Sequence, residues 1–168
     1  MPATCFFRLN GKRLSTLDCL DLGSVLAFSG NGRYINNPES TAVPKDGPIP
    51  MGKYYIVARQ SGGRHSHEIE TIEDTVRETI EDTVSGTHRA DWFALYTTTP
   101  PAGDSLIVNG VRRANFRLHP VGYFGISEGC ITLPNVDNFY VLRNWLLKQK
   151  TEKIPGTNID YYGTVTVQ

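Results

Sequence analysis

The dominant pattern along this chain is a succession of short apolar segments separated by turns. Apolar and polar residues alternate on both sides of Asn10-Gly11 and again around Asn109-Gly110, and an Asn-Gly pair is typical of two-residue hairpin turns. Other segments are rich in aromatic and β-branched residues, which favour strands. The predicted strands fall within residues 4–9, 13–20, 24–28, 53–59, 91–98, 105–118 and 161–167. The pattern therefore predicts a mainly β fold.

A different periodicity appears in residues 67–84. Apolar residues recur there three or four positions apart on an otherwise polar and acidic sequence, which predicts an amphipathic helix. Its apolar stripe consists of Ile69, Ile72, Val76, Ile80 and Val84. We expect this helix to form an insertion at about 62–88. Its acidic face has two interpretations, an ordinary solvated surface or a lid hinged at the flanking glycines.

A second helix is predicted to open at Pro134 and to reach about Lys150. Asn135 is a suitable N-cap, because its side chain can accept a hydrogen bond from an amide of the first turn. The predicted buried side consists of Phe139, Leu142, Trp145 and Leu146. At 168 residues the chain has the size of one domain. We expect residues 1–168 to form a single mainly β (α+β) unit with two helices.

Charge balance and hydropathy exclude several kinds of partner. Lysine plus arginine and aspartate plus glutamate each number 17, so no net field attracts the chain to nucleic acid. No apolar run approaches the roughly 20 residues of a membrane-spanning helix. Residues 1–20 lack the basic and apolar regions of a signal peptide. We therefore expect no nucleic-acid partner, no membrane insertion and no signal peptide.

The cysteines are Cys5, Cys19 and Cys130, and an odd number cannot form a closed set of disulfides. Cys5 and Cys19 lie in the two predicted strands around Asn10-Gly11, so they could face each other. Unpaired cysteines, however, are commonly buried as small apolar residues. We expect buried free thiols at these two positions.

The segment from His119 to Cys130 carries the most specific chemical signal. Gly122, Gly125 and Gly129 allow a short loop to fold back so that its ends meet. Cysteine is a nucleophile as the thiolate, and a base within hydrogen-bond reach lowers its pKa from about 8.5. A polar turn also changes into an apolar strand at the cysteine. We expect an acyl-transfer site with Cys130 as nucleophile and His119 as base, the alternative being a buried structural thiol.

Neighbouring groups could support this chemistry. The backbone N–H groups at Gly129, Cys130 and Ile131 are candidate oxyanion-hole donors. Ser127 could orient the loop or the substrate, or it could be a turn residue bonded to its own backbone. No acidic residue adjoins His119, so a backbone carbonyl is a candidate to fix the imidazole tautomer. The sequence leaves the third member of the triad unassigned.

The Ser127-Glu-Gly-Cys130-Ile segment resembles the Ser-His-Gly-Cys box of the L,D-transpeptidases, which cross-link or trim peptidoglycan through a cysteine thioester. Glu128 stands where that family has a histidine, and Thr132 stands where it has an arginine. A closer resemblance is to the L,D-transpeptidase-like effectors that bacterial type VI secretion systems inject into rival cells. This resemblance is carried by residues 28–34, 47–56, 92–96, 115–120 and 127–133.

The resemblance implies an L,D-transpeptidase-like β-sandwich or barrel and an antibacterial toxin. Such a toxin is made in the cytoplasm without a signal peptide, exported by the type VI secretion apparatus and active in the periplasm of the target cell. Its implied reaction is L,D-carboxypeptidase cleavage of the peptidoglycan tetrapeptide between the third residue and the terminal D-alanine. Exchange of that D-alanine for other D-amino acids is the related transpeptidase reaction. A cognate immunity protein is also implied.

Mapped onto this chain, the resemblance makes Cys130 the nucleophile and His119 the general base that later protonates the leaving amine. Arg117 and Arg33 are candidates to hold substrate carboxylates, because a guanidinium fork matches a carboxylate. Either arginine could equally be surface charge. Tyr34 could line the cleft or pack under the loop, and Glu128 is a further candidate for substrate binding. These candidates all lie in segments that carry the resemblance.

His65 and His67 lie in a glycine-rich polar segment without a third ligand nearby, whereas catalytic zinc needs three protein ligands. We therefore expect no metal and no cofactor. Two alternatives to the carboxypeptidase remain open. One is a non-catalytic β-domain that binds peptidoglycan, with Glu128 and Thr132 marking a degenerate site. The other is a cysteine amidase that cuts elsewhere on the stem peptide.

Overall fold

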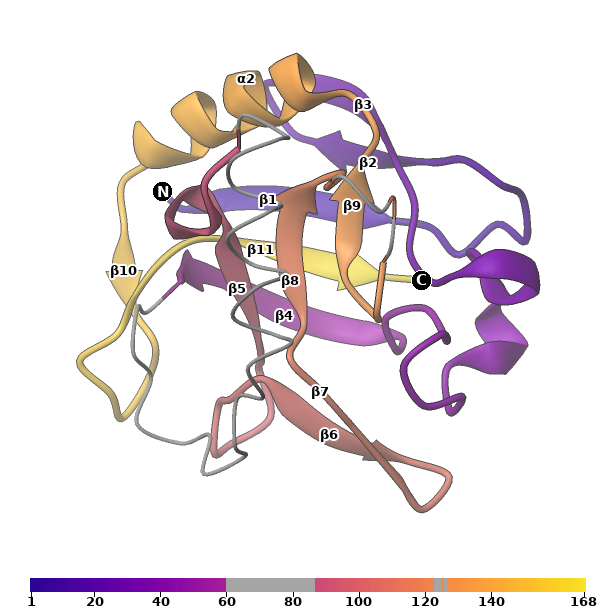
Figure 1. Cartoon of the computed structure of the whole chain (residues 1–168). Coiled ribbons are helices and arrows are strands. Elements are labelled where there is room, and N and C mark those ends of the chain that lie inside the picture. Colours follow the sequence, from indigo (N-terminus) through magenta and orange to yellow (C-terminus); the bar gives the residue numbers. More distant parts are fainter. Residues whose placement is uncertain (60–86, 123–124, 126) are drawn as a thin grey trace.

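The computed structural model describes residues 1–59, 87–122, 125 and 127–168, and Figure 1 shows their arrangement. The predicted acidic helix at 67–84, and with it the lid interpretation, lies outside the described residues. The predicted insertion at about 62–88 also lies outside them, except for its last two residues. Among the described helices, none is long and apolar enough to cross a membrane.

Most of the described strands belong to one large sheet. Burial alternates along its strands as the sequence pattern predicts; in β1, for example, Ala3, Cys5 and Phe7 are buried and the residues between them are partly exposed. The strands of this sheet are β1 (Ala3–Phe7), β2 (Ser15–Cys19), β3 (Gly23–Ala27), β4 (Gly52–Ala58), β5 (Phe93–Thr97), β8 (Arg117–Pro120), β9 (Ile131–Leu133), β10 (Glu152–Lys153) and β11 (Asp160–Val167). Loops contain the 3-10 helices η1 (Gly32–Tyr34), η2 (Pro38–Ser40) and η3 (Arg89–Asp91).

The sheet is nearly closed into a barrel. Its strands follow the order β3-β2-β1-β11-β4-β5-β8-β9, with β10 paired to β11. β1 is parallel to β11 and β8 is parallel to β9, while the other neighbours are antiparallel. Phe28, just after β3, forms an antiparallel bridge with Thr132 of β9, through backbone hydrogen bonds of 2.9 and 2.8 Å. This bridge connects the two ends of the sheet, and the predicted mainly β fold is confirmed (Figure 1).

The described part of the chain contains one α-helix, α2 (Val136–Leu147), which packs on β8, β9 and β11. Asn135 caps it as predicted, accepting a hydrogen bond of 2.9 Å from an amide of the first turn. Trp145, predicted to be buried, is only partly buried at the edge of the core. The fully buried residues of the helix are Phe139, Leu142 and Leu146. The helix therefore supports the strands on which the candidate site lies.

A separate two-stranded sheet, formed by β6 (Ser105–Val108) and β7 (Val111–Ala114), projects from the barrel (Figure 1). Asn109 and Gly110 join the two strands with φ of 48° and 79°. Positive φ at both central residues is what a type I′ hairpin turn requires, and Asn-Gly tolerates it. The predicted hairpin is thus confirmed, and it leads directly into β8.

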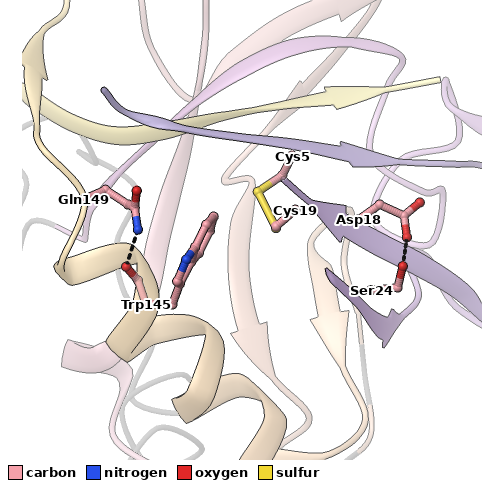
Figure 2. Close-up of a disulfide and its surroundings, with 6 residues drawn as sticks. All are labelled: Cys5, Asp18, Cys19, Ser24, Trp145 and Gln149. Carbon is pink, nitrogen blue, oxygen red and sulfur yellow. Dashed lines mark hydrogen bonds between the residues drawn. A yellow bond between two sulfur atoms is a disulfide. The ribbon is translucent and has the colours of Figure 1, made fainter. Parts of the chain in front are cut away.

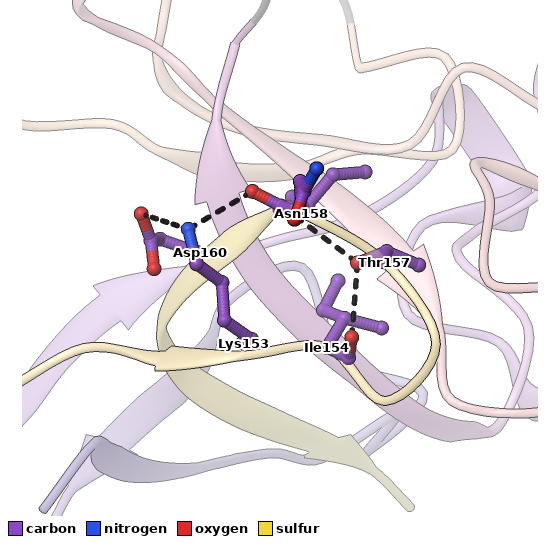
Figure 3. A network of polar contacts seen from close by, with 6 residues as sticks. Lys153, Ile154, Thr157, Asn158 and Asp160 are labelled. Atoms are coloured by element: carbon purple, nitrogen blue, oxygen red, sulfur yellow. Dashed lines mark hydrogen bonds and ion pairs between the residues drawn. The ribbon is translucent and has the colours of Figure 1, made fainter.

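Local polar contacts close the turn between β10 and β11 (Figure 3). Lys153 Nζ donates to the carbonyl oxygen of Asn158 and pairs with the carboxylate of Asp160, both at 3.0 Å. Thr157 Oγ1 donates to the carbonyl oxygen of Ile154 at 2.9 Å. The exposed ion pair contributes little stability by itself. Together these bonds fix the turn and hence the entry of the chain into β11.

Cys5 and Cys19 form a disulfide, so the expectation of two free thiols is wrong (Figure 2). The two residues pair directly in the antiparallel register of β1 and β2, which brings their Cα atoms to 4.1 Å. Both are buried in the core, as expected. Burial was therefore predicted correctly, but the register of the hairpin adds a covalent link. Cys130 is the free cysteine among the described residues.

Candidate functional site

His119 and Cys130 lie on neighbouring parallel strands, β8 and β9. In their register, His119 pairs with Thr132 and Leu118 pairs with Ile131, and Cys130 directly precedes β9. Side chains alternate along a strand, and paired residues of a ladder share a face. His119, Thr132 and Cys130 therefore belong to one face, with Cys130 diagonally across from His119. The two ends of the segment from His119 to Cys130 therefore lie on adjacent strands, while residues 123, 124 and 126 between them lie outside the described residues.

Both ring nitrogens of His119 have partners. Nδ1 lies 2.6 Å from the carbonyl oxygen of Pro120, which can only accept, so Nδ1 carries the proton. Nε2 therefore holds the lone pair, and it accepts from Thr132 Oγ1 at 3.3 Å. This agrees with the prediction that a backbone carbonyl could fix the tautomer. The nitrogen left as the base is Nε2.

An aromatic stack covers the imidazole of His119. The ring of Trp92 lies parallel to it at an interplanar angle of 19° and a centroid distance of 4.3 Å. The guanidinium groups of Arg89 and Arg59 lie 5.2 and 5.7 Å from the Trp92 ring centroid. The histidine is thus enclosed between the indole and the sheet, and only 4% of its surface is exposed.

Burial lowers the pKa of His119 to about 4, because the imidazolium would lose its hydration. The hydrogen bond to the Pro120 carbonyl acts in the opposite direction but is weaker. The positive charges of Arg89, Arg117 and Arg59 lower the pKa further. The imidazole is therefore neutral at pH 7 and can accept a proton.

The thiol of Cys130 is also buried, and burial raises its pKa to about 11. Its Sγ donates to the carbonyl oxygen of Asn115 at 3.7 Å. The backbone N–H and the charge of Arg117 lower the pKa of the thiol, the charge of Glu128 raises it, and Arg113 lowers it. Desolvation is the largest of these effects, so the thiol is protonated at pH 7.

No hydrogen bond joins the described side chains of Cys130 and His119, since the sulfur is bonded to Asn115 and Nε2 to Thr132. The expectation that the imidazole ionises the sulfur is therefore not met in this conformation. The pair is neutral, and proton transfer requires the Cys130 side chain to turn toward Nε2. Catalytic hydrogen bonds are often long before substrate binds, so this arrangement is compatible with a general base.

A network of hydrogen bonds holds the Ser127–Cys130 loop. Ser127 is fully buried, and its hydroxyl donates to the Cys130 carbonyl oxygen at 2.9 Å while accepting from the Gly30 amide at 3.3 Å. Its own amide donates to Asn31 Oδ1 at 2.9 Å. Ser127 thus bonds both to the backbone of its own loop and to the Gly30–Asn31 segment, and the role expected for it from the sequence stays a prediction. The segment from Ser29 to Tyr34 is its scaffold.

The other predicted loop residues have different surroundings. Gly129 is buried with φ of +78°, Ile131 is fully buried in the core, and Glu128 is exposed. The side chain of Ile131 thus packs in the core, which leaves only its backbone for the predicted role. The oxyanion-hole role of these amides stays a prediction.

The predicted carboxylate-binding residues have different surroundings. Arg117 is half-buried, and its Nη1 pairs with Asp104 Oδ2 at 3.0 Å. Arg33 is exposed, donates to Tyr34 Oη at 2.8 Å and lies over the Tyr34 ring. Arg33 also lines an open cleft of about 500 Å³. The other residues lining this cleft are Gly11, Lys12, Arg13, Asn31, Gly32, Ile35 and Gly125.

Comparison with known families decides the relationship of the chain. The model of the Tlde1 domain matches residues 23–157, which is most of the sequence. The chain belongs to the Tlde1 domain family. This is a family of type VI secretion effectors, which are secreted and act in target cells, and which imply a secretion apparatus and an immunity partner. No match was found among curated proteins or among solved structures.

The matched Tlde1 region includes β3 to β10 and therefore both His119 and Cys130. β1, β2 and β11 fall outside it, and they complete the sheet. In the described part of this Tlde1 chain, no three His, Cys, Asp or Glu side chains are grouped so as to hold a metal ion. His65 and His67, considered as ligands from the sequence, lie outside the described residues.

Four residues around the site were not assigned roles from the sequence. Trp92 and Thr132 contact His119, Asn31 anchors Ser127, and Arg113 lies behind Gly129. The sequence held a signal for Asn31 and Trp92, because both lie in segments that resemble the effectors. For Arg113 the signal is its position two residues after Val111 in a strand, where alternation predicts a shared face.

Proposed function

We propose that this Tlde1 domain is a cysteine L,D-carboxypeptidase that removes the terminal D-alanine from peptidoglycan tetrapeptide stems in the periplasm of a target cell. The same enzyme would exchange that D-alanine when another D-amino acid is available. The observation that carries the proposal is the face that His119 of β8 shares with Cys130, which directly precedes β9, with His119 Nε2 as the unprotonated ring nitrogen. Membership of a type VI effector family supports a toxic activity.

The reaction begins with attack of the Cys130 sulfur on the carbonyl carbon of the third stem residue, while the thiol proton moves to His119 Nε2. The amide bond to D-alanine breaks, and the same proton goes from His119 to the leaving amine. A thioester remains on Cys130. Water or a D-amino acid then attacks it, losing a proton to His119, and that proton returns to the sulfur when the thioester breaks.

Substrate charge would assist the base. The pKa of His119 is lowered in part by Arg89, Arg117 and Arg59. Stem peptides carry free carboxylates, and a carboxylate placed near these arginines would offset their field and raise the pKa of the imidazole. Arg117 and Arg33 are the residues proposed to bind such carboxylates, and Tyr34 and Glu128 would line the approach. The base would therefore be strongest when substrate is bound.

The proposal is tested by mass spectrometry of disaccharide-tetrapeptide muropeptides incubated with purified protein, with and without D-methionine. We expect conversion to tripeptide with release of D-alanine, and a D-methionine-containing tetrapeptide when D-methionine is added. Cys130→Ala and His119→Ala should abolish both products while the proteins remain folded. Arg112→Ala, on the exposed side of β7, is the matched control and should retain activity. Unchanged product profiles in the Cys130 or His119 variant would refute the proposal.

A non-catalytic peptidoglycan-binding domain is the second candidate. It is favoured because Cys130 and His119 are both neutral and are hydrogen-bonded to other residues instead of to each other. If the domain binds without cleaving, insoluble peptidoglycan should retain the wild-type protein and the Cys130→Ala variant equally. The muropeptides would then be recovered intact.

A further inference from the structure

Arg113 of β7 is a buried charge, with 4% of its surface exposed. Its Nη1 donates to the carbonyl oxygens of Thr41 and Pro48, and its Nη2 donates to the carbonyl oxygen of Gly47 at 2.9 Å. No carboxylate among the described residues forms an ion pair with it. Carbonyl oxygens accept hydrogen bonds from the guanidinium but do not neutralise its positive charge. Burial of such a charge costs free energy, and this cost indicates that the charge has a role.

Arg113 lies directly behind the cysteine loop. A Cβ atom added to Gly129 would be 2.7 Å from Arg113 Nη2, which is too close for two unbonded heavy atoms. Gly129 also has φ of +78°, a backbone conformation that favours glycine. Two constraints therefore require glycine at position 129, namely the space that the Arg113 guanidinium occupies and the positive φ of the backbone.

We propose that Arg113 is a positioning residue for Cys130: its guanidinium braces Gly129 from behind and adds a fixed positive charge, beside that of Arg117, which favours the thiolate. The inference rests on the proposed role of Cys130 as nucleophile. Because His119 is neutral, the positive charges near the sulfur that favour its thiolate are those of Arg117 and Arg113. The carbonyl bonds to residues 41–48 hold the guanidinium in place.

The charged groups around the sulfur agree with this role. Arg117 and Arg113 lower the pKa of Cys130, and Glu128, which is exposed, raises it. Arg113 in turn faces the phenol of Tyr54, whose pKa is raised by burial, so that group stays neutral. Cys130 is thus the acid beside Arg113 that the proposed reaction ionises.

The test measures the rate at which iodoacetamide alkylates Cys130 as a function of pH. Cys5 and Cys19 are held in the disulfide and do not react. We expect Arg113→Met to raise the apparent thiol pKa by about one unit, which slows alkylation about tenfold at pH 8. Arg113→Lys, which keeps the charge, should stay within about half a unit of wild type. Arg112→Met on the exposed side of the same strand is the control and should not differ.

A folded Arg113→Met protein that reacts like wild type would overturn the inference, as would Arg113→Lys reacting as slowly as Arg113→Met. If Arg113→Met does not fold, Gly129→Ala is compared with Gly156→Ala. Gly156 has φ of +75° but open space around it, so both changes strain the backbone similarly and only one presses on Arg113. We expect alkylation to slow about tenfold in Gly129→Ala alone. Equal rates in the two variants would overturn the inference.

Failure of this inference differs from failure of the proposed function. If Arg113→Met does not change alkylation but Cys130→Ala and His119→Ala still abolish muropeptide cleavage, the inference fails and the proposed function stands. Absence of cleavage with an intact Arg113 effect on alkylation would refute the carboxypeptidase and leave the electrostatic role of Arg113 standing.

Discussion

Thr132 Oγ1 lies 3.3 Å from His119 Nε2 across the parallel pair of β8 and β9. The hydroxyl thus occupies the lone pair that the proposed base needs, and the sulfur of Cys130 is bonded to Asn115 instead. Thr132 also closes the barrel through its backbone bridge to Phe28. Thr132 therefore takes part both in the bridge that joins the two ends of the sheet and in the hydrogen bond that occupies His119 Nε2.

Replacing Thr132 by valine should free Nε2 for the thiol. The two side chains have nearly the same shape, so we expect a loss of about 1 kcal/mol of stability from one hydrogen bond. Alkylation of Cys130 at pH 7 should become several-fold faster, since the base is no longer occupied. Thr132→Ser keeps the hydroxyl and serves as the control. A Thr132→Val protein as unreactive as His119→Ala would contradict this role.

Stability should fall on both sides of neutral pH. His119 has a pKa of about 4 in the folded state and 6.5 ordinarily, so the unfolded chain binds a proton that the folded chain does not, and stability decreases as pH falls from 6.5 to 4. Cys130 is shifted from 9.0 to about 11, so stability decreases as pH rises from 9 to 11. Each effect is worth about 3 kcal/mol at most.

Urea denaturation at several pH values checks both arms. His119→Gln should reduce the loss of stability at acid pH and leave the loss at alkaline pH unchanged. Cys130→Ala should reduce the loss at alkaline pH and leave the loss at acid pH unchanged. An acid arm that persists in folded His119→Gln would mean that other groups cause it.

Reduction of the disulfide should weaken the fold without changing the site. Cys5 and Cys19 are 14 residues apart, and a loop of about this size is stabilised by roughly 3 kcal/mol when it is closed. Urea denaturation with and without a reductant measures the difference, in a Cys130→Ala background so that only the disulfide responds. The double variant Cys5→Ser, Cys19→Ser should show no response to the reductant. Equal midpoints in oxidised and reduced protein would contradict the prediction.

Asn31 should matter for turnover more than for folding. Its Oδ1 accepts from the Ser127 amide, so Asn31→Ala releases the loop that carries Cys130. We expect a loss of about 1 kcal/mol of stability but at least a tenfold decrease in kcat, because small displacements of a nucleophile are costly. Asn37→Ala removes a comparable bond, to the amide of Glu39, away from the loop. Equal kcat values for the two variants would contradict the role of Asn31.

Much of the fold could be predicted because it depends on local patterns. The strands that flank Asn109-Gly110 pair through a two-residue turn, as predicted. β1 and β2 also pair directly, but residues 8–14 join them, so the two-residue turn expected at Asn10-Gly11 is wrong. The helix after Asn135 was found from its cap and its period. The two-residue strand β10 was missed, because so short a segment has no periodicity.

The features that could not be predicted depend on register and on distant contacts. Whether Cys5 and Cys19 bond follows from which residues pair across the hairpin, and the pattern of apolar residues does not fix that pairing. Arg113 is bonded to residues 65 to 72 positions away along the chain. The ionisation states of His119, which Trp92 covers, and of Cys130 depend on how deeply the fold buries them. The sequence therefore indicated the pair but not its neutrality.

The most direct test of the account is intact-protein mass spectrometry after rapid acid quenching of the protein with tetrapeptide substrate. The account predicts a transient mass increase equal to the substrate minus D-alanine, located on Cys130, which builds up in wild-type protein, is absent in Cys130→Ala and is greatly reduced in His119→Ala. Release of D-alanine by the Cys130→Ala protein at the wild-type rate, with no adduct on any variant, would contradict it.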